Sequence, residues 1–558
     1  MQGHEPLAST TIGIWRPDGD EVPQEGLYAL EAALLRTDQP LFLVRHQTKL
    51  AVAASGRAIV GGDENGPRND PGAPNCPLVA WVPPVSPRTL GSAAFRDAFG
   101  LQYAYVMGAM ANGIASVEMV AAAGKAGMIG FFGAAGLTPD RIEPAIDRLQ
   151  AMLPQGPFGF NLIHSPHEPD MEAAVVDLYL RRGVRNISAA AYLRLTLPLI
   201  RYRLHGIHRD AGGRIVCPNQ VVAKVSRVEV ARQFFAPPPE KLLTRLVQEG
   251  TLSEAEAEMA RSVPVASDLT AEADSGGHTD NRQALTLLPT MMGLRDEMAA
   301  RHRYAEPINV GLAGGIATPQ AAAAAFAMGA DYILTGTVNQ ACVESGTSDQ
   351  VRRMLAEAQQ ADVAMAPSAD MFEMGVRVQV LKRGTMFALR AQKLYDFYRQ
   401  YDNWDQVPAK DRALLERDFF RGTFDEEWRR TRDFFHRRDP RQIERAEKDP
   451  RHKMALVFRA YLGKSSQWAN TGEPSRQMDY QIWCGPAIGA FNQWTRGSDL
   501  EKPERRECVS IALNLLLGAA VASRAAALRQ QGVRLPAAIG KFKPLPLSKI
   551  RSLLAADS

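Results

Sequence analysis

The sequence predicts an α/β protein built on a TIM barrel, a (β/α)8 fold, with a small β-containing N-terminal domain before it and a helical C-terminal extension after it. Short strands that are apolar throughout alternate with helices over 101–345, which is typical of a parallel sheet buried on both faces. A strand, helix, strand unit also occupies 308–337, where Thr318 and Pro319 start the helix and Gly329 ends it. We expect four regions: 1–100, the barrel domain 101–384, a helical subdomain 385–480, and a helical segment 481–558 packing on the barrel.

Residues 1–100 have a character of their own. Two short runs, 41–45 and 50–53, are strand-like, and 67–87 is rich in Pro, Gly and Asn. We expect a small β domain that ends in an irregular connection over 67–87.

Eight apolar runs supply the strands of the predicted barrel. They lie at 104–108, 128–133, 158–163, 186–190, 221–225, 269–273, 308–316 and 331–337. Helical patterns separate them, one of which opens with a capping box from Ser253 to Glu256. In this architecture, the functional residues lie at the carboxyl ends of the strands.

The composition changes beyond the barrel. Arg, Glu and aromatic residues over 385–460 are spaced as in amphipathic helices, and a last apolar helix over 505–531 is expected to pack back on the barrel. The basic side chains are Arg429, Arg430, Arg432, Arg437, Arg438, Arg441, Arg445, Lys448 and Arg451. Two interpretations stay open: solvated helix faces with local acidic partners, or a surface that receives an acidic protein.

The bulk properties show no signature of several classes of protein. A net charge of +4 gives no nucleic-acid signature, and the five cysteines are scattered without the spacing of a metal site or a disulfide framework. The sequence has neither a signal segment nor a long uninterrupted apolar run. We expect a cytoplasmic protein that binds no metal, no nucleic acid and no membrane.

The loop after the first strand and a side chain on the third strand are candidates for binding a flat ring. Ala109, Met110 and Asn112 belong to a loop small enough for a planar ring to lie against its backbone. Asn161 offers a donor and an acceptor to a ring edge. These residues are predicted to bind a cofactor.

Lys224 and His278 are the predicted catalytic residues. A buried lysine without a partner is costly, so an anionic or electron-accepting ligand would explain Lys224 on strand five, although an outward orientation is the alternative. His278 follows the double glycine Gly276-Gly277, which would let the backbone pass close under a ligand. A structural histidine is the alternative there.

Glycines after the last two strands predict a phosphate site. Ala313, Gly314 and Gly315 end the seventh strand, and Gly336 and Thr337 end the eighth. In TIM barrels these two loops are the usual phosphate cradle, although simple turn glycines are the alternative. Flavin mononucleotide (FMN) fits this arrangement, with Lys224 also facing the ring. No Gly-x-Gly-x-x-Gly follows a strand, so a separate dinucleotide domain is not expected.

At this point the motifs resemble a known family. The segments 272–278, 311–316 and 335–337 are similar to signatures of the nitronate monooxygenase and FMN-dependent enoyl reductase superfamily. The segments 374–387, 453–458 and 479–491 closely resemble PfaD-type trans-acting enoyl reductases, which serve polyunsaturated fatty acid synthases and trans-acyltransferase polyketide synthases.

The resemblance implies an FMN enzyme that passes hydride from NADPH to the β-carbon of a 2-enoyl thioester on an acyl carrier protein. His278 matches the family histidine and is implied to protonate the α-carbon or to stabilise the enolate. Lys382 and Arg383 are candidate phosphate contacts or surface charges. Cys484 is not expected to act as a nucleophile, because thioester reduction needs none.

Two rival functions stay open. A nitronate monooxygenase would use the same cofactor, with His278 as a base and O2 as oxidant. A non-catalytic assembly protein would keep the barrel as a scaffold, although the intact glycines and His278 argue against this. A homodimer is also an option, by analogy with other barrels.

Overall fold

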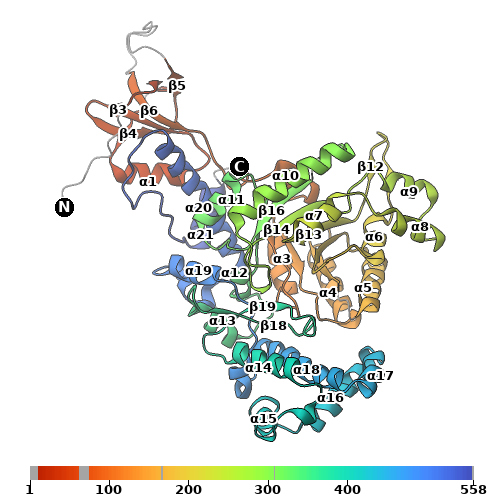
Figure 1. The fold of residues 1–558 in the computed structure, drawn as a ribbon. Helices are drawn as coiled ribbons and strands as arrows, with labels where there is room; N and C mark the ends of the chain where they lie inside the picture. Colours follow the sequence, from red (N-terminus) through yellow and green to blue (C-terminus); the bar gives the residue numbers. More distant parts are fainter. Residues whose placement is uncertain (1–9, 20, 62–74, 165–167, 307, 556–558) are drawn as a thin grey trace.

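The structure, a computed structural model, describes residues 10–19, 21–61, 75–164, 168–306 and 308–555. Its centre is a closed barrel of eight parallel strands, the TIM barrel predicted from the sequence (Figure 1). In spatial order the strands are β7 (Tyr105–Met107), β8 (Ile129–Phe132), β9 (Gly159–Ile163), β10 (Asn186–Ala190), β13 (Gln220–Val225), β14 (Asp268–Glu272), β16 (Asn309–Ala313) and β17 (Ile333–Thr335). Each of the eight predicted runs contains one of these strands or most of it.

Helices connect successive strands on the outside of the barrel. They are α3 (Val117–Lys125), α4 (Pro139–Met152), α5 (Pro169–Arg181), α6 (Leu197–Leu204), α7 (Val228–Phe235), α8 (Glu240–Gln248), α9 (Glu254–Ala260), α10 (Ala284–His302) and α11 (Pro319–Ala327). The short helix α12 (Thr337–Gln340) follows the last strand, β17. Thr318 caps α11 by accepting a hydrogen bond from the backbone N–H of Ala321, and Ser253 and Glu256 form the predicted capping box of α9. A small hairpin of β11 (His208–Arg209) and β12 (Ile215–Val216) precedes β13.

The N-terminal region is a six-stranded sheet with one helix, α1 (Leu27–Leu35). Its strands, in spatial order, are β2 (Gln24–Glu25), β4 (Lys49–Ala53), β3 (Leu41–His46), β6 (Cys76–Val82), β1 (Gly13–Arg16) and β5 (Arg57–Val60). The predicted irregular connection over 67–87 is wrong for Cys76–Val82, which pairs with both β1 and β3 inside the sheet. Most side chains of this strand are buried, and this burial overrides the Pro-rich composition there. Residues 67–74 of that prediction lie outside the described residues.

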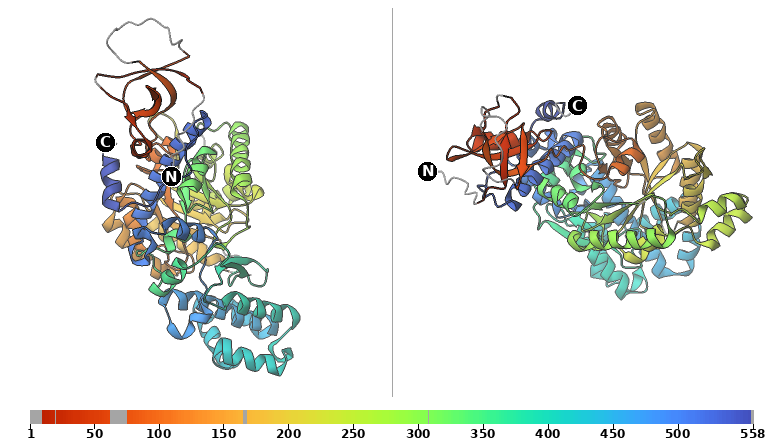
Figure 2. Two further views of the ribbon diagram at one scale, coloured as in Figure 1. Left: turned by 90° about the vertical axis from the view of Figure 1, so that its left-hand side faces the viewer. Right: turned by 90° about the horizontal axis from the view of Figure 1, so that it is seen from above.

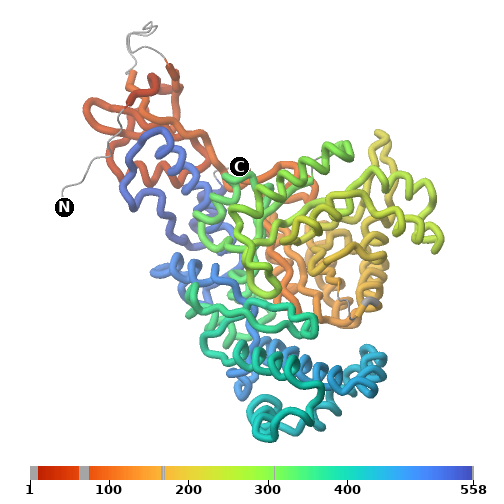
Figure 3. Tube along the Cα trace, in the orientation of Figure 1, coloured from red at the N-terminus to blue at the C-terminus, as the bar shows by residue number. Residues whose placement is uncertain are grey.

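The helix α20 (Cys508–Gln530) joins the N-terminal sheet to the barrel (Figure 3). It packs on α11, as predicted, and on α1 and β6. The buried guanidinium of Arg524 donates hydrogen bonds to the carbonyls of Gln39 (2.7 Å) and Ala33 (3.2 Å). Among the described residues this is the one helix long and apolar enough to cross a membrane, and 78% of its apolar window is buried inside the protein. The sequence predicted this helix over 505–531 but not that its apolar run is this long; its burial is that of a core helix.

Further helices follow the barrel, and some of them form a separate layer at the other end of the molecule, opposite the N-terminal sheet (Figure 2). They are α13 (Asp349–Ala356), α14 (Phe387–Gln400), α15 (Ala409–Leu414), α16 (Phe424–Arg438), α17 (Arg441–Lys448), α18 (Pro450–Thr471), α19 (Ala487–Thr495) and α21 (Leu547–Ala555), of which α14 to α18 make up that layer. A core rich in aromatic side chains, including Phe372, Phe420, Phe458 and Tyr461, holds α14, α18 and the neighbouring turns together.

A three-stranded sheet connects the barrel to this layer. It consists of β15 (Gly277–His278), β19 (Arg377–Leu381) and β18 (Val363–Pro367). His278 is paired with Val378, so the loop after β14 is fixed by a segment that follows the barrel. This sheet positions the catalytic candidate.

Candidate active site

A cavity of about 1110 Å³ lies between the carboxyl ends of the barrel strands and the helical layer. Its volume slightly exceeds the roughly 300–1,000 Å³ of ordinary ligand pockets. All thirteen site residues predicted from the sequence line it: Ala109, Met110, Asn112, Asn161, Lys224, Gly276, Gly277, His278, Ala313, Gly314, Gly315, Gly336 and Thr337. The structure thus brings the set together, while the role of each residue stays a prediction.

His278 faces Asp370, which belongs to the turn between β18 and β19. His278 Nε2 lies 3.1 Å from Asp370 Oδ1, and the two side chains are 41% and 40% exposed. Burial lowers the pKa of His278, but the charge and hydrogen bond of Asp370 outweigh this, so the pKa lies above its usual value. Burial raises the pKa of Asp370, yet the histidine lowers it to about 2. The pair therefore favours a protonated His278.

Lys224 has a protein partner, contrary to the expectation of an unpaired lysine. Its Nζ donates a hydrogen bond of 2.7 Å to Glu272 Oε1, and Ser275 Oγ donates to the same oxygen at 3.2 Å. Lys224 faces the cavity and not the outside of the barrel. Because β13 and β14 are adjacent, Lys224 and Glu272 come from neighbouring strands, and the pair is neutral overall.

The two candidate amides also have protein partners. Asn161 Oδ1 accepts from the backbone N–H of Ala135 (3.3 Å), and Nδ2 donates to the carbonyl of Ser188 (3.2 Å). Asn112 Nδ2 donates to Ser466 Oγ of α18 at 3.3 Å. Asn161 therefore has one N–H and one lone pair left for a ring edge, fewer than the free side chain would offer.

The glycines differ in what surrounds them. At Gly315 and Gly336 no heavy atom lies within 4 Å of the place where a Cβ would stand, so the space beside their backbone is open. At Gly314 a Cβ would be 2.6 Å from the carbonyl carbon of Ala273, and at Gly276 it would be 2.8 Å from the backbone nitrogen of Cys484. Gly315 and Gly336 thus suit close approach of a phosphate, whereas chain packing explains Gly314 and Gly276.

A segment after α18 closes one side of the cavity. The backbone of 481–485 runs along β19. The N–H of Leu381 donates to the carbonyl of Ile482 (2.8 Å), and the N–H of Cys484 donates to the carbonyl of Gln379 (3.2 Å). Trp483 and Gly485 line the cavity, and the N–H of Gly485 donates to the hydroxyl of Thr337 at 3.3 Å. This segment ties the predicted phosphate loop to the helical layer.

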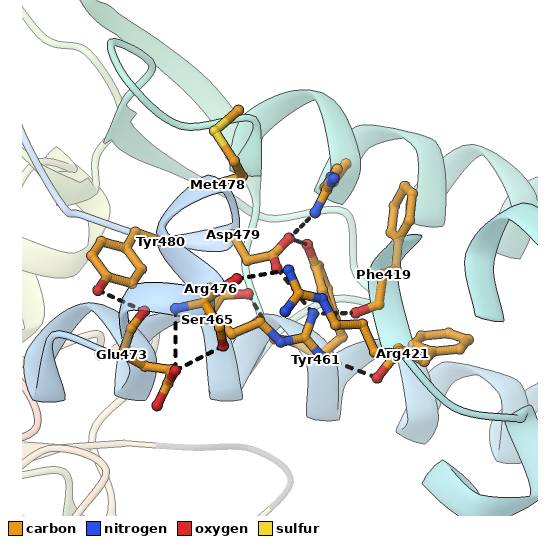
Figure 4. Close-up of polar contacts among 12 residues, drawn as sticks. Phe419, Arg421, Tyr461, Ser465, Glu473, Arg476, Met478, Asp479 and Tyr480 are labelled. Atoms are coloured by element: carbon orange, nitrogen blue, oxygen red, sulfur yellow. Dashed lines mark hydrogen bonds and ion pairs between the residues drawn. The ribbon is translucent and has the colours of Figure 1, made fainter. Parts of the chain in front are cut away.

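Buried ionic contacts fix the start of that segment (Figure 4). Asp479 has no exposed surface and accepts hydrogen bonds from Tyr461 (2.6 Å), Arg476 (3.0 Å) and Arg390. Arg476 also donates to the carbonyl of Phe419 at 2.7 Å. The network joins α14, α18 and the 3-10 helix Pro474–Asp479 immediately before the cavity wall.

The basic residues after the barrel fit both interpretations in part. Ion pairs engage Arg430 with Glu427, Arg432 with Asp433, Arg438 with Glu168, Arg441 with Asp170 and Asp439, and Arg451 with Asp402. Within the described residues, no ion pair is found for Arg429, Arg437, Arg445 and Lys448. The pair of Arg438 and Glu168 links α16 to the barrel beside the cavity.

Three other candidates lie outside the cavity lining. Lys382 and Arg383 are not among the described residues that line it, and Arg383 Nη1 instead lies 3.7 Å from Asp362 Oδ2. Cys484 is fully buried, and burial raises the pKa of its thiol well above the usual value, which makes it a poor nucleophile.

Sequence reasoning missed Asp370, Glu272 and the helical wall. Glu272 is the first residue of the motif 272–278, and its pairing with Lys224 follows once β13 and β14 are known to be adjacent. Asp370 carries no local signal, since its partner is 92 residues away.

Comparisons with known proteins agree with this architecture. The family model for nitronate monooxygenase matches residues 94–391, and the model for the inserted helical domain of [acyl-carrier-protein] S-malonyltransferase matches residues 401–480. The enoyl reductase domain of MlnA, from the macrolactin biosynthesis cluster of Bacillus amyloliquefaciens, superposes with a TM-score of 0.75 at 40% identity, over 80% of this chain and 99% of that one.

Two curated relatives are similar over most of the chain. One component of the polyunsaturated fatty acid synthase of Thraustochytrium sp. is 44% identical over 90% of this chain and 33% of that protein. The polyketide biosynthesis protein PksE of Bacillus subtilis is 45% identical over 78% of this chain and 57% of that protein. The chain therefore spans about a third to just over half of the length of these relatives. It belongs to the nitronate monooxygenase family, and its predicted resemblance to the enoyl reductases of polyunsaturated fatty acid and polyketide synthases is confirmed.

Proposed function

We propose that the chain is an FMN- and NADPH-dependent enoyl reductase that acts in trans on 2-enoyl thioesters carried by an acyl carrier protein, in polyketide or polyunsaturated fatty acid synthesis. The proposal rests on one observation, which is that three features line the same cavity. They are the contact of His278 with Asp370, the ion pair of Lys224 with Glu272, and the open space at Gly315 and Gly336. The enoyl reductase domain of MlnA, similar over 80% of the chain, supports the same activity.

The lining residues fit FMN. The open space beside Gly315 and Gly336 would let a single phosphate approach their backbone, and Ala109, Met110 and Asn112 line the cavity beside the end of β7. Asn161 keeps one donor and one acceptor for a ring edge. When bound, FMN would supply a hydride, received from NADPH, to the β-carbon of the thioester.

His278 would serve the second half of the reaction. Reduction at the β-carbon leaves negative charge on the thioester oxygen and the α-carbon, and a positioned donor stabilises such charge. Since Asp370 favours the protonated ring, His278 is suited to donate a hydrogen bond to the oxygen or a proton to the α-carbon. Asp370 would hold the ring through Nε2 and leave Nδ1 for the substrate.

The Lys224 ammonium would stabilise negative charge in the cavity. Its pairing with Glu272 reduces the cost of keeping that ammonium partly buried when no ligand is present. Because Glu272 faces the same space, it would also limit how strongly the lysine attracts an anion.

The synthase relatives suggest the partner and the setting. Two relatives are named as polyunsaturated fatty acid synthase subunits and two as polyketide biosynthesis proteins, so a carrier protein of such an assembly would deliver the thioester. A cytoplasmic location would fit the five buried free cysteines.

The family model for nitronate monooxygenase keeps one rival function in view. In that reaction His278 would act as a base, which requires the neutral ring. The carboxylate beside His278 raises the pKa of the ring, which suits a proton donor and also strengthens a base, so this pair does not separate the two reactions. The similarity to the enoyl reductase domain of MlnA is what favours the reductase.

The proposal is tested by incubating the purified protein with FMN, NADPH and a crotonyl carrier protein, followed by mass analysis of the acyl group. We expect a mass gain of two hydrogens, dependent on NADPH. If the crotonyl group is unchanged while a nitronate is consumed with O2, the monooxygenase function is correct. If neither substrate changes, the barrel is a scaffold.

A further inference from the structure

Arg459, on α18 of the helical layer, contacts the turn that carries Asp370. Its Nε donates a hydrogen bond of 2.9 Å to the carbonyl of Ala369, the residue before Asp370, and its Nη1 lies 3.2 Å from Glu373 Oε1. The side chain is only 13% exposed and lines the cavity. We infer that Arg459 is a positioning residue, which holds the turn between β18 and β19 so that Asp370 faces His278. This inference rests on the proposed function for its role in reduction.

Other contacts also hold the turn: Phe372 is fully buried in the aromatic core, and the side chain of Ser368 hydrogen-bonds to Asp370 itself. The N–H of Ser368 donates to Val376 (2.9 Å) at its base, and the N–H of Met371 donates to Ser368 Oγ at 3.4 Å. Arg459 contacts both sides of Asp370 through one planar guanidinium, at Ala369 and at Glu373. A guanidinium fixes two acceptors at once, which a single ammonium donor cannot do in the same geometry.

Glu373 depends on Arg459 for its charge partner. His452 Nδ1 lies 3.8 Å from Glu373 Oε1, but burial, followed by the charge of Arg445, lowers the pKa of His452 to about 4. His452 is therefore neutral near pH 7, and Arg459 is left as the cation beside the carboxylate. Loss of Arg459 would leave a poorly partnered buried carboxylate three residues from Asp370, which would disturb the turn.

Removal of Arg459 is expected to change the pKa of His278 in a direction that reveals how the arginine acts. The charged groups that face His278 are Asp370 from the turn, Lys224 from β13 and Glu272 from β14. If Arg459 acted only as a nearby positive charge, its removal would raise the pKa of His278. If it acts by holding Asp370, its removal loosens the carboxylate and lowers that pKa. The two roles thus give opposite shifts.

The test is a histidine NMR titration of the full chain without substrate, with the His278 signal assigned as the one absent from His278→Gln. We expect Arg459→Met to shift the His278 titration to lower pH, in the same direction as Asp370→Asn. The double variant should titrate like Asp370→Asn alone, because the arginine acts through the aspartate. Arg459→Lys should give an intermediate shift.

Arg451→Met is the matched control. Arg451 lies on the same helix, but its guanidinium stacks on Tyr398 at 4.8 Å and it does not line the cavity among the described residues. In Arg451→Met, His278 should titrate at the same pH as in the unaltered protein. Three results would overturn the inference. The His278 titration could shift to higher pH in Arg459→Met, it could stay unshifted although Arg459→Met is folded, or the shifts of the two single variants could add in the double variant. These outcomes do not depend on turnover, so failure of the proposed function would be seen separately, in the unaltered enzyme.

Discussion

In the proposed reaction, the chemistry of the cavity depends most on His278 and Asp370. His278 is on β15 and Asp370 is in the turn between β18 and β19 of the same three-stranded sheet, and the two side chains meet at 3.1 Å. The sequence predicted the histidine, because it follows a double glycine at a strand end. It could not predict the aspartate, whose position is set by pairing of β15 with β19.

Replacing His278 should separate binding from turnover. We expect His278→Ala to keep its FMN content and to lose enoyl reduction by roughly 10²- to 10⁴-fold, the usual contribution of a positioned acid or base. Cofactor content is read from the absorbance of the purified protein and turnover from NADPH oxidation. Unchanged turnover would remove His278 from the mechanism.

Asp370→Asn should move the pH dependence of the reaction. The folded pKa of His278 is raised above its usual value, so activity that needs the protonated ring is present below this pKa and is lost as the pH rises through it. Without the carboxylate the pKa falls, so the alkaline limb of kcat should move to lower pH. A limb that does not move would show that another group titrates.

Two neighbouring glycines allow a matched test of the phosphate site. Gly315 and Gly314 have similar left-handed φ values of 79° and 85°, so alanine costs each about 1–2 kcal/mol of strain. Only in Gly314→Ala would the new Cβ also clash, because it would lie 2.6 Å from the carbonyl carbon of Ala273. We therefore expect Gly315→Ala to fold and bind FMN more weakly, and Gly314→Ala to lose stability first. Thermal unfolding and FMN titration distinguish them; equal FMN affinity in Gly315→Ala and the unaltered protein would contradict the assignment.

At the scale of elements, helix and strand signals in the barrel were strong and those outside it were weak. The barrel strands are short apolar runs separated by capped helices, so local signals sufficed. The strand Cys76–Val82 was missed because Pro and Gly nearby suggested a loop, while its pairing with β1 and β3 is not local.

The segment over 481–485 depends on the buried carboxylate of Asp479. Asp479→Ala leaves Arg390 and Arg476 without their anion, and breaking such a buried pair costs about 3–5 kcal/mol. We expect a large fall in the unfolding midpoint in denaturant. The control is Asp418→Ala, whose partner Arg417 is exposed, with no measurable loss expected. Equal stability of the two variants would contradict the importance of the network.

At the scale of the whole molecule, the family could be predicted from motifs, whereas the closure of the cavity could not. The barrel supplies one wall, but α16, α18 and the segment over 481–485 supply the other. Those contacts join parts of the chain that are up to several hundred residues apart, which periodicity does not reveal. The boundaries at 100, 384 and 480, a homodimer and the roles of the site residues stay predictions.

The most direct measurement is an anaerobic half-reaction. The protein is loaded with FMN, reduced with NADPH until its yellow absorbance bleaches, and mixed with a crotonyl carrier protein in a stopped-flow instrument. We predict rapid return of the oxidised absorbance together with a butyryl product. A flavin that stays bleached until a nitronate and O2 are added, or a protein that binds no flavin, would contradict the proposal that this chain is an enoyl reductase.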